Sequence, residues 1–308
     1  MYDGTAHRPF VHRQLMITVA KKIKDSMSEE TQQKFIQKYA NRLNIAKRYA
    51  NTRIEPHYFI EYHIVYLMTF AFLFLSMFII REIGIEITKS PTGGTLAACI
   101  FAIIFPIFET CGGYFYDFGE IFFFSLATLL AVKGYWLALI LIAPIAEYNK
   151  ESFLFFLVTL FPFLAAKFGN KKTFVVLTTA IFFSGLAYLY VKSLYVGNDG
   201  GTTEFYLFKH LEFIFSGWVY KEITYGVFFG MGTFFLHILF IMCIVKNSWG
   251  KLSSQWKYHI GIATLINVPL YILFCSLGEI RNFSLLYIGF IAMLSIFIKE
   301  MINIEQKN

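Results

Sequence analysis

Two carboxylates, Asp117 and Glu120, stand at helical i, i+3 spacing between two apolar stretches, and Glu109 lies just upstream. A carboxylate near the centre of a bilayer costs about 2.5 to 3.5 kcal/mol even on lenient scales, so a group of them in an apolar chain indicates a functional site. One interpretation is that a partly buried carboxylate acts as a general base or a metal ligand. The alternative is that Asp117 and Glu120 begin a helix, where its positive N-terminus favours them.

Two further charged groups lie between apolar stretches. Asn149, Lys150 and Glu151 could hold a phosphate through the Lys150 ammonium, or form a solvated ion pair of small energetic effect. Arg281 could grip a phosphate with two parallel hydrogen bonds, or it could simply neutralise Glu279. Both groups are therefore candidate substrate-binding residues.

A fourth group opens the chain, where Arg8 and Arg13 are interleaved with His7 and His12. These side chains could bind substrate phosphates, or merely anionic lipid headgroups without any chemistry. The two histidines lack metal-ligand spacing on a helix. Asp3 is a candidate catalytic carboxylate that must be anchored to be ordered.

The composition places these residues in a membrane protein. Of 308 residues, 57% are hydrophobic and 15% charged, which is far from the average of soluble domains. The alternating ten-residue strands of a transmembrane barrel are absent, so we predict an all-α, polytopic fold. The net charge of +7 falls mostly in a leading segment and in loops, which favours membrane topology over a nucleic-acid partner. Four widely spaced cysteines predict no metal site, and a divalent ion at the carboxylates stays open as a cofactor.

Apolar segments recur along most of the chain. We expect about nine of them, at about 58–80, 94–108, 119–132, 135–147, 152–166, 174–194, 223–245, 259–276 and 283–298. Several are too short to cross a hydrocarbon core of about 30 Å alone, which predicts broken or partial helices. Prolines inside four of these segments, Pro106, Pro144, Pro162 and Pro269, predict kinks.

Residues 1–57 carry 11 Lys or Arg and 5 Asp or Glu and contain no span-length apolar run. We predict an amphipathic, surface-lying arm with one helix from Pro9 to Ile23 and a second from about Ser28 that ends before Pro56. The expected domains are this arm (1–57), a membrane domain (58–298) and a short tail (299–308).

If each segment crosses once, the loops on one face hold eleven basic residues and those on the other face five. The positive-inside rule makes the first face cytoplasmic and puts every charged group described above on the outside. The basic arm would then also be external, which a surface-lying arm, a span preceding this sequence or a different span count would explain.

Four short stretches carry a resemblance to a known group of proteins: Arg8 to Leu15, Tyr116 to Glu120, Asn149 to Glu151 and Gly278 to Phe283. Together they resemble poorly characterised bacterial polytopic membrane proteins similar in layout to GT-C glycosyltransferases. The resemblance implies the bacterial inner membrane, a lipid-phosphate-linked sugar donor and a glycan or lipid acceptor. It implies Asp3 or Asp117 as the base and Arg281 or Lys150 as the phosphate contact. Such proteins carry a span before the acidic first loop, whereas this sequence opens at that loop.

The sequence thus predicts a GT-C-like glycosyltransferase of envelope polysaccharide or glycolipid assembly, with Asp117, Glu120 and Asp3 as catalytic candidates. Arg8, Arg13, Asn149, Lys150, Glu151, Glu279 and Arg281 are the substrate-binding candidates. Two alternatives stay open. The same charges could line the pathway of a transporter or flippase, or dock a partner in a non-catalytic assembly subunit.

Overall fold

The computed structural model describes residues 1–42, 58–109, 113–201, 204–215, 233–276 and 279–305. Over these ranges the chain forms twelve α-helices and no strand, which confirms the all-α fold class. The N-terminal part contains η1 (Phe10–His12), α1 (Leu15–Asp25) and α2 (Glu29–Arg42). The predicted continuation of the second helix toward Pro56 lies outside the described residues.

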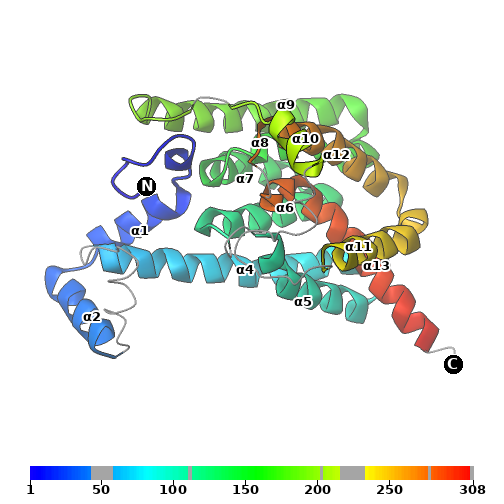
Figure 1. Ribbon diagram of the computed structural model, residues 1–308, viewed down its shortest axis with the longest axis horizontal. Coiled ribbons are helices and arrows are strands. Elements are labelled where there is room, and N and C mark those ends of the chain that lie inside the picture. The colour runs from blue at the N-terminus through cyan, green and yellow to red at the C-terminus, as the bar shows by residue number, and fades with distance from the viewer. Residues whose placement is uncertain (43–57, 110–112, 202–203, 216–232, 277–278, 306–308) are drawn as a thin grey trace.

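The body of the protein follows α2 along the chain (Figure 1). Its first half comprises α4 (Phe59–Thr88), α5 (Pro91–Phe108), α6 (Phe115–Lys133), α7 (Trp136–Asn149), α8 (Phe153–Thr159) and α9 (Phe161–Leu194). Its second half comprises α10 (Leu207–Phe215), α11 (Thr233–Ser248), η5 (Trp249–Lys251), α12 (Ser254–Phe274), η6 (Ile280–Leu286) and α13 (Tyr287–Glu305).

Five of these helices are long and apolar enough to cross a membrane: α4, α6, α9, α12, and η6 taken together with α13. All nine predicted apolar segments overlap described helices, and residues 223–232 of the segment 223–245 lie outside the described residues. The predicted segment 152–166 is α8 followed by the start of α9, and Gly169, with φ 75°, separates that start from the rest of α9. Nine crossings therefore stay a prediction.

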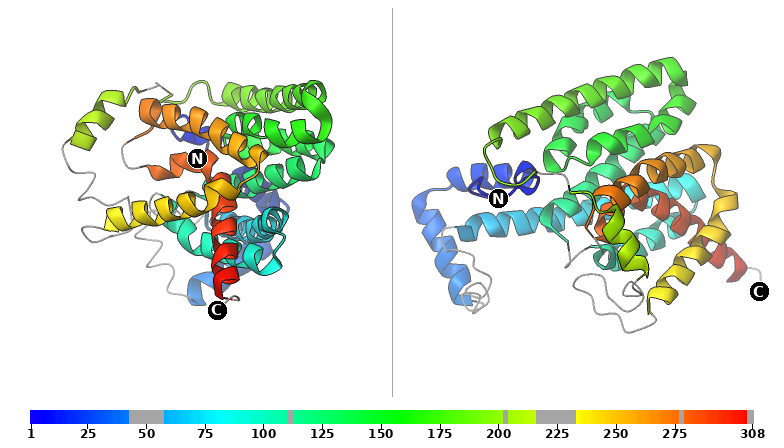
Figure 2. Two further views of the ribbon diagram at one scale, coloured as in Figure 1. Left: turned by 90° about the vertical axis from the view of Figure 1, so that its right-hand side faces the viewer. Right: turned by 45° about the horizontal axis from the view of Figure 1, so that its top comes forward.

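The helices pack side by side in the order α9, α7, α6, α4, α5, with α13 against α4 and α5 (Figures 1 and 2). Helices α4 and α6 point the same way, since Lys133 at the end of α6 pairs with Glu86 near the end of α4. Gly134, with φ 85°, then reverses the chain, so the end of α7 returns to the start of α6. This places the Asn149 group beside the Asp117 group.

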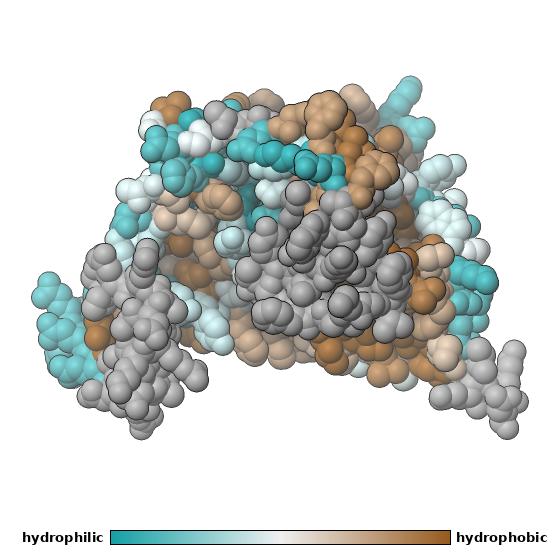
Figure 3. Space-filling model, viewed as in Figure 1, coloured by the Kyte–Doolittle hydropathy of each residue, from teal (hydrophilic) through white to brown (hydrophobic). Residues whose placement is uncertain are grey.

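The surface over α4 and α5 is largely apolar in the space-filling view (Figure 3). Large side chains such as Tyr66, Leu67, Phe70 and Phe78 are exposed along α4. A helix that leaves such side chains uncovered in water would aggregate, so this face suits contact with lipid.

The arm differs from the expectation of an apolar face lying on lipid. Met16, Ile17 and Ala20 of α1 are buried, and α1 packs against α4 and α7. An amphipathic pattern predicts that an apolar stripe is covered, but it does not specify whether lipid or protein covers it. Phe10 and Ile23 are the large apolar side chains of the predicted face that are exposed.

Close packing of α4 on α5 generates the first prediction. A Cβ added at Gly84 would lie 2.8 Å from the Gly94 Cα, so Gly84→Ala must push two backbones apart. We expect it to destabilise the protein by about 1 to 3 kcal/mol, measured as a lower unfolding temperature in detergent. Gly185→Ala is the matched control, because nothing lies within 4 Å of its added Cβ and alanine favours the helix. Equal unfolding temperatures for the two variants would contradict the packing.

Candidate functional site

Four segments far apart in sequence meet at one buried place: the residues just after η1, the start of α6, the end of α7, and η6. The start of α6 is fixed by a capping arrangement in which the Asp117 carboxylate accepts a hydrogen bond of 2.9 Å from the Tyr114 backbone N–H. Asp117 therefore caps its helix, as the simpler interpretation of the sequence expected. The same carboxylate also faces two cationic side chains.

Lys150 lies at the centre of the site. Its Nζ is 2.8 Å from Asp117 Oδ1 and 2.6 Å from Glu120 Oε2, and all three side chains are at most 6% exposed. The other oxygen of Glu120 accepts hydrogen bonds from Ser152 and, at 2.8 Å, from Ser284. Burial alone would lower the pKa of Lys150, but the two carboxylates more than offset it and raise that pKa, so the ammonium stays charged.

Arg281 approaches Asp117 from η6. Its Nη1 lies 3.3 Å from Asp117 Oδ2 and 3.4 Å from the Tyr116 hydroxyl, while its Nη2 is 3.6 Å from Glu279. The guanidinium also sits 4.5 Å from the ring centroid of Tyr114, at cation–π distance. These contacts are longer than those of Lys150, so Arg281 is the more loosely held cation.

Arg13 brings the arm into the site. It makes two hydrogen bonds to the Glu151 carboxylate, of 3.1 and 2.5 Å, and its guanidinium lies 4.2 Å from the Tyr116 ring centroid. Burial would raise the pKa of Glu151, but Arg13 more than compensates and holds it at about 2. Glu151 is thus a permanent anion that fixes the arm to the end of α7.

Three neighbouring residues complete the shell. The Asn149 amide donates a hydrogen bond of 2.8 Å to the Tyr116 carbonyl. It also lies so close to Gly119 that a Cβ added at Gly119 would collide with it. Buried Glu109 accepts a bond of 3.3 Å from the Tyr287 hydroxyl. Burial, helped by the Asp117 charge, raises the pKa of Glu109 well above its ordinary value, so it adds a neutral carboxyl group to the site.

The structure brings together Asp117, Glu120, Asn149, Lys150, Glu151, Arg281 and Arg13, with Glu279 at the edge. It does not bring in the other two candidates. The exposed Asp3 accepts a hydrogen bond from the Tyr58 hydroxyl, and Arg8 donates 2.7 Å to the Gly200 carbonyl. Both anchor the arm, so neither reaches the carboxylates of α6 through any contact in the described residues.

Sequence reasoning missed several members of the site. Ser152, Ser284 and Tyr116 are ordinary residue types without a spacing that marks them. Glu61, in contrast, is a carboxylate inside an apolar segment and is 1% exposed. The rule that singled out Asp117 would have found Glu61 as well.

No group of three His, Cys, Asp or Glu side chains suited to a metal ion occurs in the described part of the chain. Between Asp117 and Glu120, where a divalent cation would sit, the ammonium of Lys150 lies instead. The donor set therefore does not fit a metal at this position.

Comparison with known proteins adds no relative: no family model, curated protein or solved structure matches this chain. Its class is accordingly defined by the structure itself, an all-α protein with a buried charged site and, among the described residues, five candidate membrane spans.

The central ion pairs lead to a second prediction. Lys150→Met leaves Glu120 buried without a cation and Asp117 with Arg281 alone, so we expect destabilisation of about 3 to 5 kcal/mol by thermal unfolding. Adding Glu120→Gln to Lys150→Met should restore most of that loss. Lys209→Met removes an exposed ion pair with Glu204 and should cost less than about 1 kcal/mol. A double variant no more stable than Lys150→Met would contradict the assignment.

A third prediction concerns acid. Because the pKa of Glu151 is about 2 in the folded protein and higher in the unfolded chain, its contribution to stability is complete above about pH 4.5. That contribution is lost as the pH falls through 2. The difference in unfolding temperature between wild type and Glu151→Gln should stay constant from neutral pH down to about 4.5 and then shrink. A difference that persists unchanged below that pH would show that Glu151 does not pair with Arg13.

Proposed function

We propose that the protein is a membrane glycosyltransferase of GT-C type that moves a sugar from a lipid-phosphate donor to a glycan or lipid acceptor. The buried charged site, built from four distant segments, is the observation that carries this proposal. A site of this kind is expensive to bury, and structural need alone would be met more cheaply by apolar residues of similar volume.

Two unpaired donors indicate where a phosphate would bind. Arg13 Nη1 and Arg281 Nε are buried and have no hydrogen-bond partner in the described residues. An unsatisfied buried N–H group is unfavourable, and a phosphate oxygen would satisfy both guanidinium groups with charge-assisted bonds. Both guanidinium groups lie against one stacked pair of rings, 5.3 Å apart, with Arg13 on Tyr116 and Arg281 on Tyr114.

In this proposal Asp117 is the base. A phosphate that binds Arg281 competes with the 3.3 Å contact to Asp117 Oδ2, which leaves that oxygen with the Tyr114 backbone N–H as its partner and a lone pair for a proton. Asp117 then accepts the proton of the acceptor hydroxyl as the acceptor oxygen attacks the anomeric carbon. The bond from that carbon to the phosphate oxygen breaks, the phosphate keeps the electron pair, and Arg13 and Arg281 stabilise its charge. Lys150 keeps Glu120 paired throughout.

The orientation also belongs to the proposal. Lys89 follows the last residue of α4 and Lys133 ends α6, both at the helix ends opposite the charged site. The positive-inside rule expects such basic residues on a cytoplasmic face. The site would then open toward the outside of a bacterial inner membrane, where polyprenyl-linked sugars are used by the enzymes it resembles.

A second candidate is a non-catalytic assembly subunit, favoured by one observation. Every carboxylate oxygen of Asp117 and Glu120 already has a partner, so neither is a free base in this state. A transporter in which substrate displaces these pairs would use the same contacts.

The test separates these candidates. With the purified chain in liposomes and radiolabelled polyprenyl-phosphate hexoses as donors, Asp117→Asn should lower sugar transfer by about 10² to 10⁴-fold without loss of membrane insertion. Arg281→Lys should lower it by about tenfold or more, because the ammonium cannot make two parallel bonds. Lys209→Gln is the control and should transfer sugar normally. Full transfer by Asp117→Asn would rule out the base, whereas donor translocation without turnover would indicate a transporter.

A further inference from the structure

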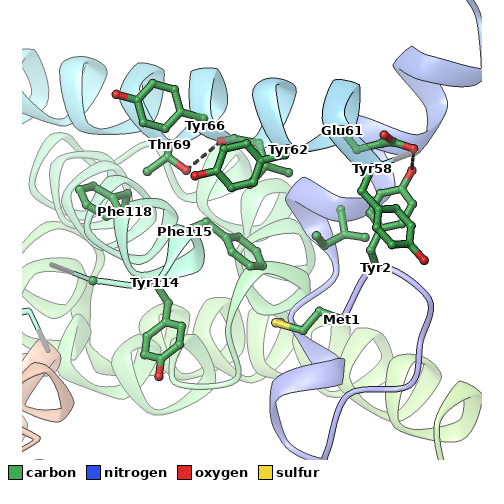
Figure 4. Close-up of a pocket in the computed structure, with 13 residues that line it drawn as sticks. Met1, Tyr2, Tyr58, Glu61, Tyr62, Tyr66, Thr69, Tyr114, Phe115 and Phe118 are labelled. Carbon is green, nitrogen blue, oxygen red and sulfur yellow. Dashed lines mark hydrogen bonds between the residues drawn. The ribbon is translucent and has the colours of Figure 1, made fainter. Parts of the chain in front are cut away.

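A separate hollow of about 630 Å³ lies beside the charged site, between the arm, the first half of α4 and the start of α6. Figure 4 shows tyrosines of α4 on one side, Tyr114 and Phe115 on the other, and Met1 and Tyr2 at one end. None of the sequence-predicted site residues lines it. Pockets of this volume that are mostly apolar, with few polar groups, are typical of small-molecule sites.

One buried polar group belongs to this hollow. Glu61 lines the hollow and is 1% exposed. Its Oε1 accepts a hydrogen bond of 2.8 Å from the Tyr2 hydroxyl and forms an ion pair with Lys24. Its second oxygen, Oε2, is buried and has no hydrogen-bond partner in the described residues. A ligand that donates a hydrogen bond would satisfy it.

The charges around Glu61 exclude ionic ligands. Lys24 already neutralises Glu61, and Lys21 lies 4.6 Å from the Tyr2 ring centroid with the Asp3 carboxylate close by on Tyr58. With the Met1 ammonium and the Asp25 carboxylate, which also act on these residues, three cations and three anions balance. A cationic ligand would be repelled by Lys21, which lies on the Tyr2 ring, and by Lys24, which pairs with Glu61. An anionic ligand would be repelled by the Glu61 carboxylate. The balance favours a neutral ligand.

The walls select among neutral ligands. Five tyrosines contribute both rings and hydroxyl groups to the walls: Tyr2, Tyr58, Tyr62, Tyr66 and Tyr114. A ligand that is a purely apolar hydrocarbon chain would need neither these hydroxyls nor Glu61. A saccharide ring presents C–H groups to aromatic faces and hydroxyls to acceptors at its edge. Both features match this lining.

We propose that this hollow is a binding site for a neutral saccharide, with Glu61 Oε2 accepting a hydrogen bond from a ring hydroxyl and the tyrosines of α4 stacking on the ring. That it serves as the acceptor site of the transfer reaction rests on the proposed function. Tyr114 connects the two sites, since it lines the hollow and also contacts Arg281. A saccharide held here would lie next to Arg13 and Arg281, the residues proposed to bind the phosphate of the sugar donor.

Photolabelling tests this binding without requiring turnover. The full chain in lipid nanodiscs is irradiated with a diazirine-bearing alkyl glucoside, or with a diazirine-bearing alkanol of the same chain length and no sugar. We expect the glucoside to label the walls of the hollow, residues 58–69 and 113–118, by mass spectrometry, and free maltose to compete with it. The alkanol should label exposed helix faces regardless of maltose.

Tyr62→Ile is the informative variant, because Tyr62 is 42% exposed and its replacement changes little of the core. We expect it to weaken competition by maltose about fivefold, the effect of one lost ring contact. Tyr190→Ile, an exposed tyrosine on α9, is the matched control and should leave competition unchanged. Unfolding temperatures confirm that both variants are folded.

The outcomes are distinct from those of the transfer assay. Labelling of the hollow by the alkanol with no effect of maltose would identify a lipid-chain site and overturn the proposal, as would labelling of neither wall. Maltose-sensitive labelling in a chain that transfers no sugar would leave the saccharide site standing while the enzymatic proposal fails. Sugar transfer without such labelling would contradict the saccharide site and leave the enzymatic proposal standing.

Discussion

The structure depends on one constraint: a charge removed from water must be matched by an opposite charge nearby. Lys150 meets it for two carboxylates at once, and it comes from the end of α7 while Asp117 and Glu120 come from the start of α6. Removal of one partner would leave an uncompensated buried charge, which is far worse than never having placed the pair there. The pairing therefore fixes the register of α6 against α7 and, through Arg281 and Ser284, the position of η6.

Charge balance extends to the arm. Within 3.3 Å, the three cations Arg13, Lys150 and Arg281 pair with the three anions Glu151, Glu120 and Asp117, while Glu279 lies farther from Arg281, at 3.6 Å. Glu109 stays out of this sum because burial keeps its carboxyl group neutral. The balance explains why a basic arm with an apolar stripe packs against the helices: Arg13 completes the set, and Met16 and Ile17 cover the adjoining apolar surface. Lipid could cover the stripe, but the Glu151 carboxylate would then lose Arg13, its cationic partner.

The sequence predicted the all-α fold and most helix positions, because long apolar runs in a chain with few charges leave no other way to satisfy the backbone. It also singled out Asp117, Lys150 and Arg281 by one physical rule, the expense of a charge in apolar surroundings, and Arg13 as a basic residue of the arm that could bind phosphate. Which of them would meet could not be read from the pattern. Asp3 and Asp117 were both catalytic candidates, and only the structure shows that Asp3 binds the Tyr58 hydroxyl while Asp117 meets Lys150. The number of crossings depends on breaks such as Gly169, whose conformation no hydropathy pattern shows.

The two proposed sites share a wall, and this arrangement gives the arm its role. Tyr114 faces the hollow on one side and packs on Tyr116 and Arg281 on the other. The arm touches both sides, with Arg13 in the charged site and Tyr2 and Lys24 on Glu61. A ligand hydrogen-bonded to Glu61 Oε2 would bind the same carboxylate that holds Tyr2 and Lys24 of the arm. A phosphate bound to Arg13 would contact the same arm, eleven residues before Lys24. The backbone bond from Gln14 to Tyr148 holds η1 and α1 in the one position in which Arg13 and Tyr2 reach their sites. Ligands of the two sites that both prefer this arm position would therefore bind cooperatively.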